Sequence, residues 1–307
     1  MKYVILVASF LALTVEQALG QYTVVGSPQP VPGLTSNERL TYINPDGNYM
    51  LVTVGTFPNL VTDSRTLDAN TGVWGSPVQV LTGNSSSAYL SPDQQTVYYQ
   101  RPIGGVSEMF RAGWPSGANE QDIESLLLNG DGPVVNGDKL VLDGPNSPNG
   151  RDVFMADITG GSFSIPVALS SDVNSAYDDE MPWLSSGGNT LLFQSNRPGG
   201  YGGYTGYGYD LYQATWDNSQ HTWTPATNLG SGVNSGSDEI WPRLAEQAGE
   251  LFFTRADASY TQFQVMEVTV VPEPSTFALL GVGVISLAAY DWRRKRRAVL
   301  LTTIQAK

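Results

Sequence analysis

Cysteine is absent from this chain of 307 residues, and histidine occurs once, as His221. The lack of cysteine excludes disulfides, thiolate metal sites and cysteine nucleophiles. A single histidine excludes a metal centre with several histidine ligands, and no Gly-x-Ser-x-Gly segment is present to place a serine nucleophile. We therefore expect no metal site and no cofactor, and we expect His221 to be solvated in an outer strand or loop.

Basic residues are scarce in the body of the chain. Residues 21–270 contain nine basic and 26 acidic side chains, a net charge of −17. Five further cations form one block near the carboxyl end, namely Arg293, Arg294, Lys295, Arg296 and Arg297. A body this acidic is soluble and repels polyanions, so the charge argues against nucleic acid as a partner.

Helical periodicity is nearly absent from the body. Short apolar runs rich in Val, Tyr, Phe and Thr alternate with clusters of Gly, Pro, Asn, Asp and Ser; examples are the runs 50–53, 96–99 and 191–193. This pattern is typical of many short strands joined by turns. The sequence therefore predicts an all-β body.

A sixty-residue offset relates two stretches of this body. Segments 173–193 and 233–253 share Val-Asn-Ser, a pair of acids, a proline, a leucine and an apolar run at identical spacing. Weaker copies of the strand, polar turn and strand pattern give five in all, near Asn44, Ser91, Asn136, Ser186 and Gln247. Four strands in forty to sixty residues form one propeller blade, so we predict a β-propeller of five four-stranded blades over residues 21–270.

The segment Tyr22–Val25 leaves the blade number open. It either contributes to a sixth, irregular blade together with strands after Phe263, or it closes the ring by joining the last blade. We favour closure.

The best-defined repeat resembles a known family. Asp178-Asp179 with Pro182, then Asn196-Arg197-Pro198-Gly199-Gly200-Tyr201-Gly202-Gly203, then Tyr209-Asp210-Leu211-Tyr212 are similar to the WD-like repeat of TolB-type β-propellers. That family usually runs from Gly-Gly-Tyr-Gly-Gly directly into Tyr-Asp-Leu-Tyr. Residues 204–208 are an insertion relative to that pattern.

Two sets of side chains are candidates for function. Asp178, Asp179, Asp238 and Glu239 would be the catalytic carboxylates if the body were a glycosidase, because such enzymes flank the scissile bond with two acids. Since all four follow the repeat, we expect them to bind turn amides or arginines instead.

The tyrosine-rich loop over residues 201–209 displays the second set, Tyr201, Tyr204, Tyr207 and Tyr209, on a glycine-rich backbone. Such rings can stack on sugars or on a partner protein, and the alternative is a flexible loop without a ligand. Trp183 and Trp241 are predicted to pack between blades.

The tail carries a further resemblance. Pro272-Glu273-Pro274 precedes the apolar run 277–290 and the basic block 293–297, in an order that resembles the PEP-CTERM sorting signal. The resemblance implies cleavage near the motif by a membrane-embedded exosortase. Fourteen apolar residues span about 21 Å as a helix, which is short for a bilayer core of about 30 Å. We expect a transient anchor over segment 271–297, with residues 298–307 in the cytoplasm.

The amino end agrees with that topology. Lys2, an apolar core from Val4 to Val15, and Ala18-Leu19-Gly20 indicate a signal peptide over residues 1–20. We therefore predict an exported, non-enzymatic propeller at the cell surface or in the extracellular matrix that binds a polysaccharide or a surface protein. The alternative is a propeller glycoside hydrolase or lyase that acts on exopolysaccharide.

Overall fold

The computed structural model describes residues 22–272, except 57–58, 82, 105, 124–129, 146–149 and 202–206. The predicted signal peptide, the apolar run, the basic block and Tyr204 lie outside the described residues. Residues 23–271 form one compact unit. Within the described ranges, no helix has the length and apolar character needed to cross a membrane.

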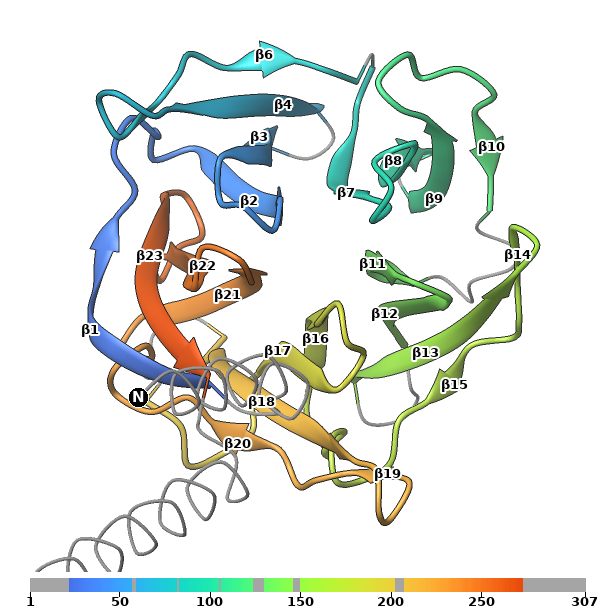
Figure 1. The fold of residues 1–307 in the computed structure, drawn as a ribbon, viewed down its shortest axis with the longest axis vertical. Helices are drawn as coiled ribbons and strands as arrows, with labels where there is room; N and C mark the ends of the chain where they lie inside the picture. The colour runs from blue at the N-terminus through green and yellow to red at the C-terminus, as the bar shows by residue number, and fades with distance from the viewer. Residues whose placement is uncertain are drawn as a thin grey trace, which may run out of the picture. The chain divides into compact units, whose positions relative to one another are not determined.

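Five antiparallel sheets stand around a central axis as the blades of a propeller (Figure 1). Blade 1 contains β2 (Glu38–Ile43), β3 (Tyr49–Thr56), β4 (Asn59–Asp68), β5 (Val73–Trp74) and β6 (Val78–Gln79). Blade 2 contains β7 (Ser86–Leu90), β8 (Thr96–Ile103), β9 (Val106–Gly113) and β10 (Gln121–Asp122). Blade 3 contains β11 (Asp131–Asn136), β12 (Lys139–Pro145), β13 (Arg151–Thr159), β14 (Ser162–Phe163) and β15 (Val167–Ala168).

Blade 4 contains β16 (Asp179–Leu184), β17 (Thr190–Ser195), β18 (Asp210–Asp217), β19 (Thr222–Trp223) and β20 (Thr227–Asn228). Blade 5 contains β21 (Asp238–Ala245), β22 (Glu250–Ala256), β23 (Phe263–Pro272) and β1 (Tyr22–Pro30). The all-β prediction and the five blades are confirmed. Ring closure is confirmed as well, because β1 is the outermost strand of blade 5, beside β23.

Proline divides the outermost strand in three of the blades. In blades 1, 3 and 4 two short strands pair with the same third strand, and Pro77, Pro166 and Pro225 lie between them. Proline has no N–H to donate to the ladder, so it is tolerated only where a strand faces solvent. The divided strand therefore marks the rim of the ring.

The core lies between neighbouring blades, because both faces of each sheet are covered. Leu40, Met50 and Val52 of blade 1 pack with Ala245 and Phe252 of blade 5. Equivalent contacts join blades 2 and 3. Burial on both faces explains why the middle strands are nearly continuous apolar runs rather than strictly alternating ones.

A register shift marks a bulge in the innermost strand of all five blades, and in four of them one residue at the bulge has a positive φ. Ser87, Gly132, Met181 and Trp241 occupy the same position, each with φ between 51° and 56°, and the ladder register shifts there. The extra residue bends the strand and redirects the side chains beside it. Those side chains face one end of the ring, where they can line a binding site.

Candidate functional site

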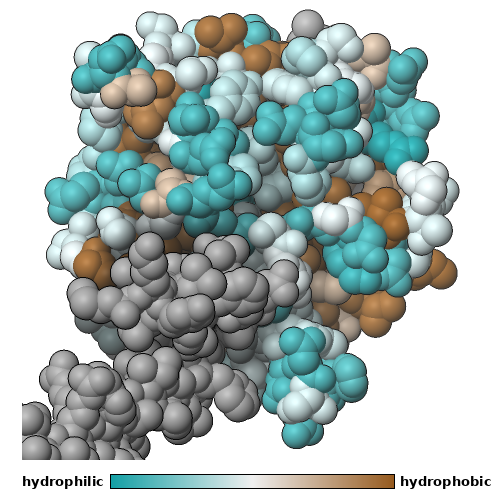
Figure 2. Space-filling model, viewed as in Figure 1, coloured by the Kyte–Doolittle hydropathy of each residue, from teal (hydrophilic) through white to brown (hydrophobic). Residues whose placement is uncertain are grey.

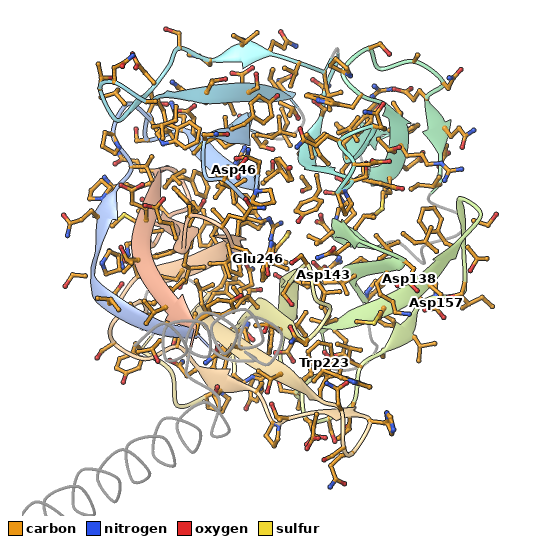
Figure 3. All side chains as sticks on the ribbon, in the orientation of Figure 1. Asp46, Asp138, Asp143, Asp157, Trp223 and Glu246 are labelled. Atoms are coloured by element: carbon orange, nitrogen blue, oxygen red, sulfur yellow. The ribbon has the colours of Figure 1, made fainter. Side chains whose placement is uncertain are left out.

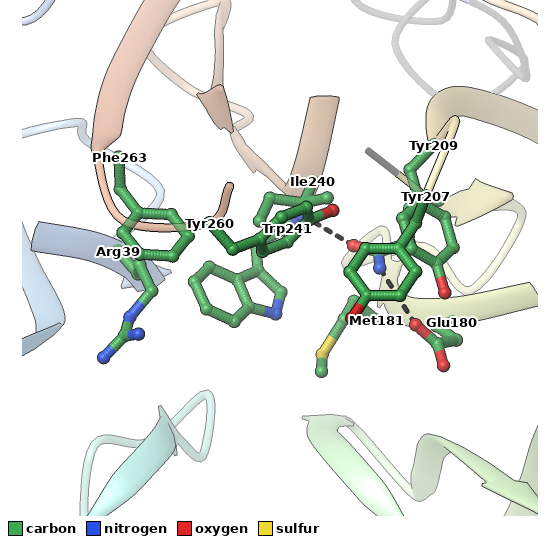
Figure 4. A pocket seen from close by; sticks show the side chains of 10 residues that line it. Arg39, Glu180, Met181, Tyr207, Tyr209, Ile240, Trp241, Tyr260 and Phe263 are labelled. Carbon is green, nitrogen blue, oxygen red and sulfur yellow. Dashed lines mark hydrogen bonds between the residues drawn. The ribbon is translucent and has the colours of Figure 1, made fainter. Parts of the chain in front are cut away.

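A cavity of about 360 Å³ lies at the end of the ring where the innermost strands begin (Figure 4). Its lining comes from β2, β16, β17, β21 and the first residue of β23, and from the connections that precede β18 and β23. We call it the central cavity. Cavities of this size in rigid scaffolds are the usual place for small-ligand binding.

Five of its ten lining residues are aromatic. Tyr207 meets Tyr260 edge to face, with ring centroids 4.9 Å apart and an interplanar angle of 84°. Trp241 stacks on Phe263 at 6.5 Å and 26°. The ring centroids of Tyr209 and Tyr207 are 6.1 Å apart. Rings that hold one another in this way offer fixed faces to a flat ligand.

A glutamine links two sides of the cavity (Figure 4). Gln194 accepts a hydrogen bond from the backbone N–H of Trp241 at 3.1 Å and donates one to the Glu180 carboxyl at 3.1 Å. The bulge at Trp241 and the acid on β16 are thereby held in fixed positions relative to each other.

Glu180 shares one arginine with a buried acid of blade 3. Arg151 donates from Nε to Asp143 at 2.6 Å, and the same nitrogen lies 3.5 Å from the Glu180 carboxyl. Asp143, near the middle of the ring in Figure 3, also accepts the backbone N–H of Met181. Burial and the charge of Asp143 raise the pKa of Glu180 to about 8, and the same causes raise the pKa of Asp131 to about 6.

Arg39 of β2 completes the wall. Its guanidinium lies 4.9 Å from the Phe263 ring centre and 5.7 Å from that of Trp241. Nη2 donates to the carbonyl of Gly55 at 2.7 Å, while Nε is buried without a hydrogen-bond partner. Desolvation by burial lowers the pKa of Arg39.

The acids that were identified from the repeat bind backbone groups and arginines. Asp179 accepts from the backbone and hydroxyl of Ser175 and from Arg197 at 2.5 Å. Glu239 makes the same contacts with Ser235 and Arg255. In blade 1 the corresponding acid, Glu38, binds Thr35 and Arg65. The three bridges fasten the start of an innermost strand.

The other two predicted acids hold loops. Asp238 accepts the backbone N–H groups of residues 207–209 and the hydroxyl of Tyr260 at 2.6 Å. It therefore orders two cavity-lining segments without lining the cavity itself. Asp178 accepts from the backbone of Arg151 and from Asn196.

The predicted tyrosines divide into two groups. Tyr207, which is 65% exposed, and Tyr209, which is buried, line the central cavity, whereas Tyr201, which is 48% exposed, lies outside its lining. His221 is exposed at the turn between β18 and β19, as expected.

Trp241 packs against a cluster from blades 4 and 5, as predicted, but it also lines the central cavity, which was not predicted. The bulge places Trp241 in the cavity wall at the position of Met181, whereas Trp183 is buried at the position of Arg243. No signal in the repeat indicated Trp241, Arg39 or Glu180, because the innermost strands differ at these positions from blade to blade.

The remaining buried arginine has a structural role. Arg243 donates to the carbonyls of Thr41 at 2.6 Å and Pro182 at 3.2 Å, so it joins blade 5 to blades 1 and 4. Burial lowers its pKa to about 10. Elsewhere, polar side chains cover much of the visible face of the ring (Figure 2). Among the described residues, no group of three or more His, Asp or Glu side chains could hold a metal ion.

Comparison with known proteins identifies the tail. Residues 270–296 match the PEP-CTERM protein-sorting motif. The predicted sorting signal is confirmed, and the chain is accordingly an exported protein sorted to the cell surface. No curated protein matches the sequence.

Solved structures resemble the propeller. A protein described as a candidate TolB from Agrobacterium tumefaciens is 16% identical, with 79% of this chain and 81% of that chain covered and a TM-score of 0.49. TolB from Acinetobacter baumannii is 12% identical, with 77% and 57% covered and a TM-score of 0.46. A candidate glycoside hydrolase from Bacteroides ovatus is 12% identical, with 82% and 97% covered and a TM-score of 0.47. The likeness to TolB-type propellers concerns the fold alone.

Proposed function

We propose that this exported propeller binds a polysaccharide in the central cavity and does not turn it over. The observation that carries the proposal is the combination of Trp241, Tyr207 and Tyr260 with Gln194 in one concave site. Ring faces stack on the apolar faces of pyranoses, and a few fixed polar groups orient the hydroxyls. A surface protein that inserts a side chain is the other partner compatible with this lining.

The experiment is a glycan array with the full-length protein, purified in mild detergent. Tyr207→Ala should weaken binding about fivefold, since a lost aromatic contact of about 1 kcal/mol corresponds to that factor. Tyr201→Ala is the matched control, because Tyr201 is exposed in the same loop but outside the cavity lining. Absence of any glycan binding, or equal loss in both variants, would refute the proposed site.

The tail carries the second part of the proposal. We infer that an exosortase cuts near Pro272-Glu273-Pro274 after the apolar segment has held the chain transiently in the membrane. The mature mass, measured on protein from the cell surface, tests this. A mass that lacks residues 293–307 is expected, and an intact basic block would refute cleavage.

One observation favours a second function, cleavage of a polysaccharide by a glycoside hydrolase or a lyase. Glu180 lies in the cavity wall with its pKa raised to about 8, and a carboxyl that stays protonated near neutral pH can act as a general acid. Release of reducing ends or unsaturated sugars that disappears in Glu180→Gln would establish this activity. Binding without product release would leave the binding function.

A further inference from the structure

Most arginines of the described residues have an acidic partner. Five of the eight pair with carboxylates: Arg65, Arg101, Arg151, Arg197 and Arg255 meet Glu38, Glu120, Asp143, Asp179 and Glu239. Arg111 binds Gln121 and a carbonyl, and Arg243 binds carbonyls. Within this same part of the chain, Arg39 alone combines the lack of a carboxylate partner with a place in the cavity lining.

The guanidinium of Arg39 is held in place, but not all of its hydrogen-bond donors have partners. Two rings lie against it, and the Gly55 carbonyl accepts from Nη2 at 2.7 Å. Among the described residues, neither Nε nor Nη1 has a hydrogen-bond partner. Because Nε is buried and Nη2 already binds a carbonyl, Nη1 is the donor left for a ligand, and a charged donor that is held in place favours anionic groups.

The charge of the residues that line the central cavity also favours an anionic ligand. Glu180 is the one acid among the lining residues, and its pKa of about 8 keeps it largely protonated near neutral pH. Arg39 then supplies the permanent charge of the cavity. The acidic body repels polyanions at long range, but ionic strength screens that repulsion over about 8 Å at physiological salt, so the short-range contact decides selectivity.

We infer that the central cavity selects an acidic sugar, whose pyranose ring stacks on Trp241 and whose carboxylate pairs with Arg39. This inference rests on the proposed polysaccharide binding and names the ligand class. A sulfate ester on a sugar offers a similar anion. The inference commits to the carboxylate, and sulfated sugars in the test below distinguish the two anions.

Matched pairs of oligosaccharides test the inference with the full-length protein. Each pair has the same rings and linkages, with a carboxylate in one member and a hydroxymethyl group in the other; glucuronate with glucose and mannuronate with mannose are suitable tetramers. Methyl esters of the acidic members and sulfated neutral members complete the set. Titration calorimetry should show at least one acidic tetramer binding about tenfold more tightly than its neutral partner and its ester.

Arg39→Met should remove that preference, so that acid, ester and neutral sugar bind with similar affinity, whereas Arg111→Met should keep the preference. Arg111 is the matched control because it also lacks a carboxylate partner but lies on blade 2, outside the cavity lining. Equal binding of acid, ester and neutral sugar overturns this inference and leaves the proposed function standing. Stronger binding of the sulfated member overturns the carboxylate assignment, and a lack of all binding overturns both proposals. The ester comparison needs no variant, so it decides the matter even where Arg39→Met does not fold.

Discussion

At the residue scale, Glu180 is the side chain whose state is set most strongly by its surroundings. It faces Asp143, Asp178, Tyr209, Gln194 and the single cation Arg151. Burial and negative neighbours raise its pKa from 4.5 to about 8. The folded protein therefore keeps a proton on this carboxyl at pH values where the unfolded chain has released it. The stability that this proton confers is complete below the ordinary glutamate pKa and is lost as the pH rises through about 8.

The first prediction concerns Glu180→Gln, which mimics the protonated carboxyl. The variant should unfold at about the same temperature as the original protein at pH 4.5. At pH 9 it should unfold roughly 2–4 °C higher for each kcal/mol that ionisation of Glu180 costs. Differential scanning fluorimetry at both pH values measures the effect. Glu246→Gln, at the other end of the ring, controls for the loss of a negative charge. A difference between Glu180→Gln and the original protein that is unchanged from pH 4.5 to pH 9 would contradict the raised pKa.

At the element scale, three innermost strands carry, as first or second residue, an acid that bridges a preceding Ser or Thr to an arginine of its own blade. In blade 4 the bridge is desolvated: Asp179 is fully buried and Arg197 is 17% exposed. In blade 2 the pair Arg101 and Glu120 is more open, at 22% and 37% exposed. Buried and open pairs should therefore differ in energy.

The second prediction is that Arg197→Met destabilises the propeller by about 3–5 kcal/mol, because it leaves the Asp179 carboxylate buried without its cation. Arg101→Met should cost about 0–1 kcal/mol, since its pair is screened by solvent. Urea unfolding of the two variants measures the contrast. The double variant Asp179→Asn with Arg197→Met should recover part of the loss, and equal costs for Arg197→Met and Arg101→Met would argue against the fastening role.

The innermost strands also explain which features could be predicted from the sequence and which could not. The sixty-residue offset is visible because Asn174 and Asn234, and Asp179 and Glu239, make equivalent backbone and arginine contacts in two blades. Repetition reveals the scaffold, so the fold and the structural acids could be predicted. A binding site departs from the repeat: Arg39, Glu180 and Ile240 occupy one position on three blades with three chemistries.

The bulge is a second reason why the cavity-lining residues could not be predicted from the sequence. One extra residue shifts the alternation of faces, so a pattern of period two assigns Trp241 to the wrong side. The surroundings of Trp241 become visible only in the folded ring, where Phe263 of the same blade stacks on the indole and blade 1 brings Arg39 beside it.

At the scale of the whole propeller, closure depends on a strand that contributes little apolar burial. No residue of β1 is buried, yet β1 covers the outer edge of β23. Val31, immediately after β1, is buried and donates to the Val265 carbonyl at 3.0 Å. The backbone ladder is therefore the main contribution of β1, and its loss would expose an unpaired edge.

The third prediction follows from that exposed edge. A full-length variant that lacks residues 22–30 should keep its five inner sheets but unfold roughly 5–10 °C lower, on the scale of about 2–4 °C per kcal/mol for a domain of this size. It should also self-associate as concentration rises, because the free edge of β23 can pair with another copy. A synthetic peptide of residues 22–30, added in excess, should restore the unfolding temperature and the monomer, whereas a peptide of the same composition in shuffled order should not. Sedimentation velocity with and without each peptide measures the association, and a monomeric variant of unchanged stability would show that the ring does not need β1 to close.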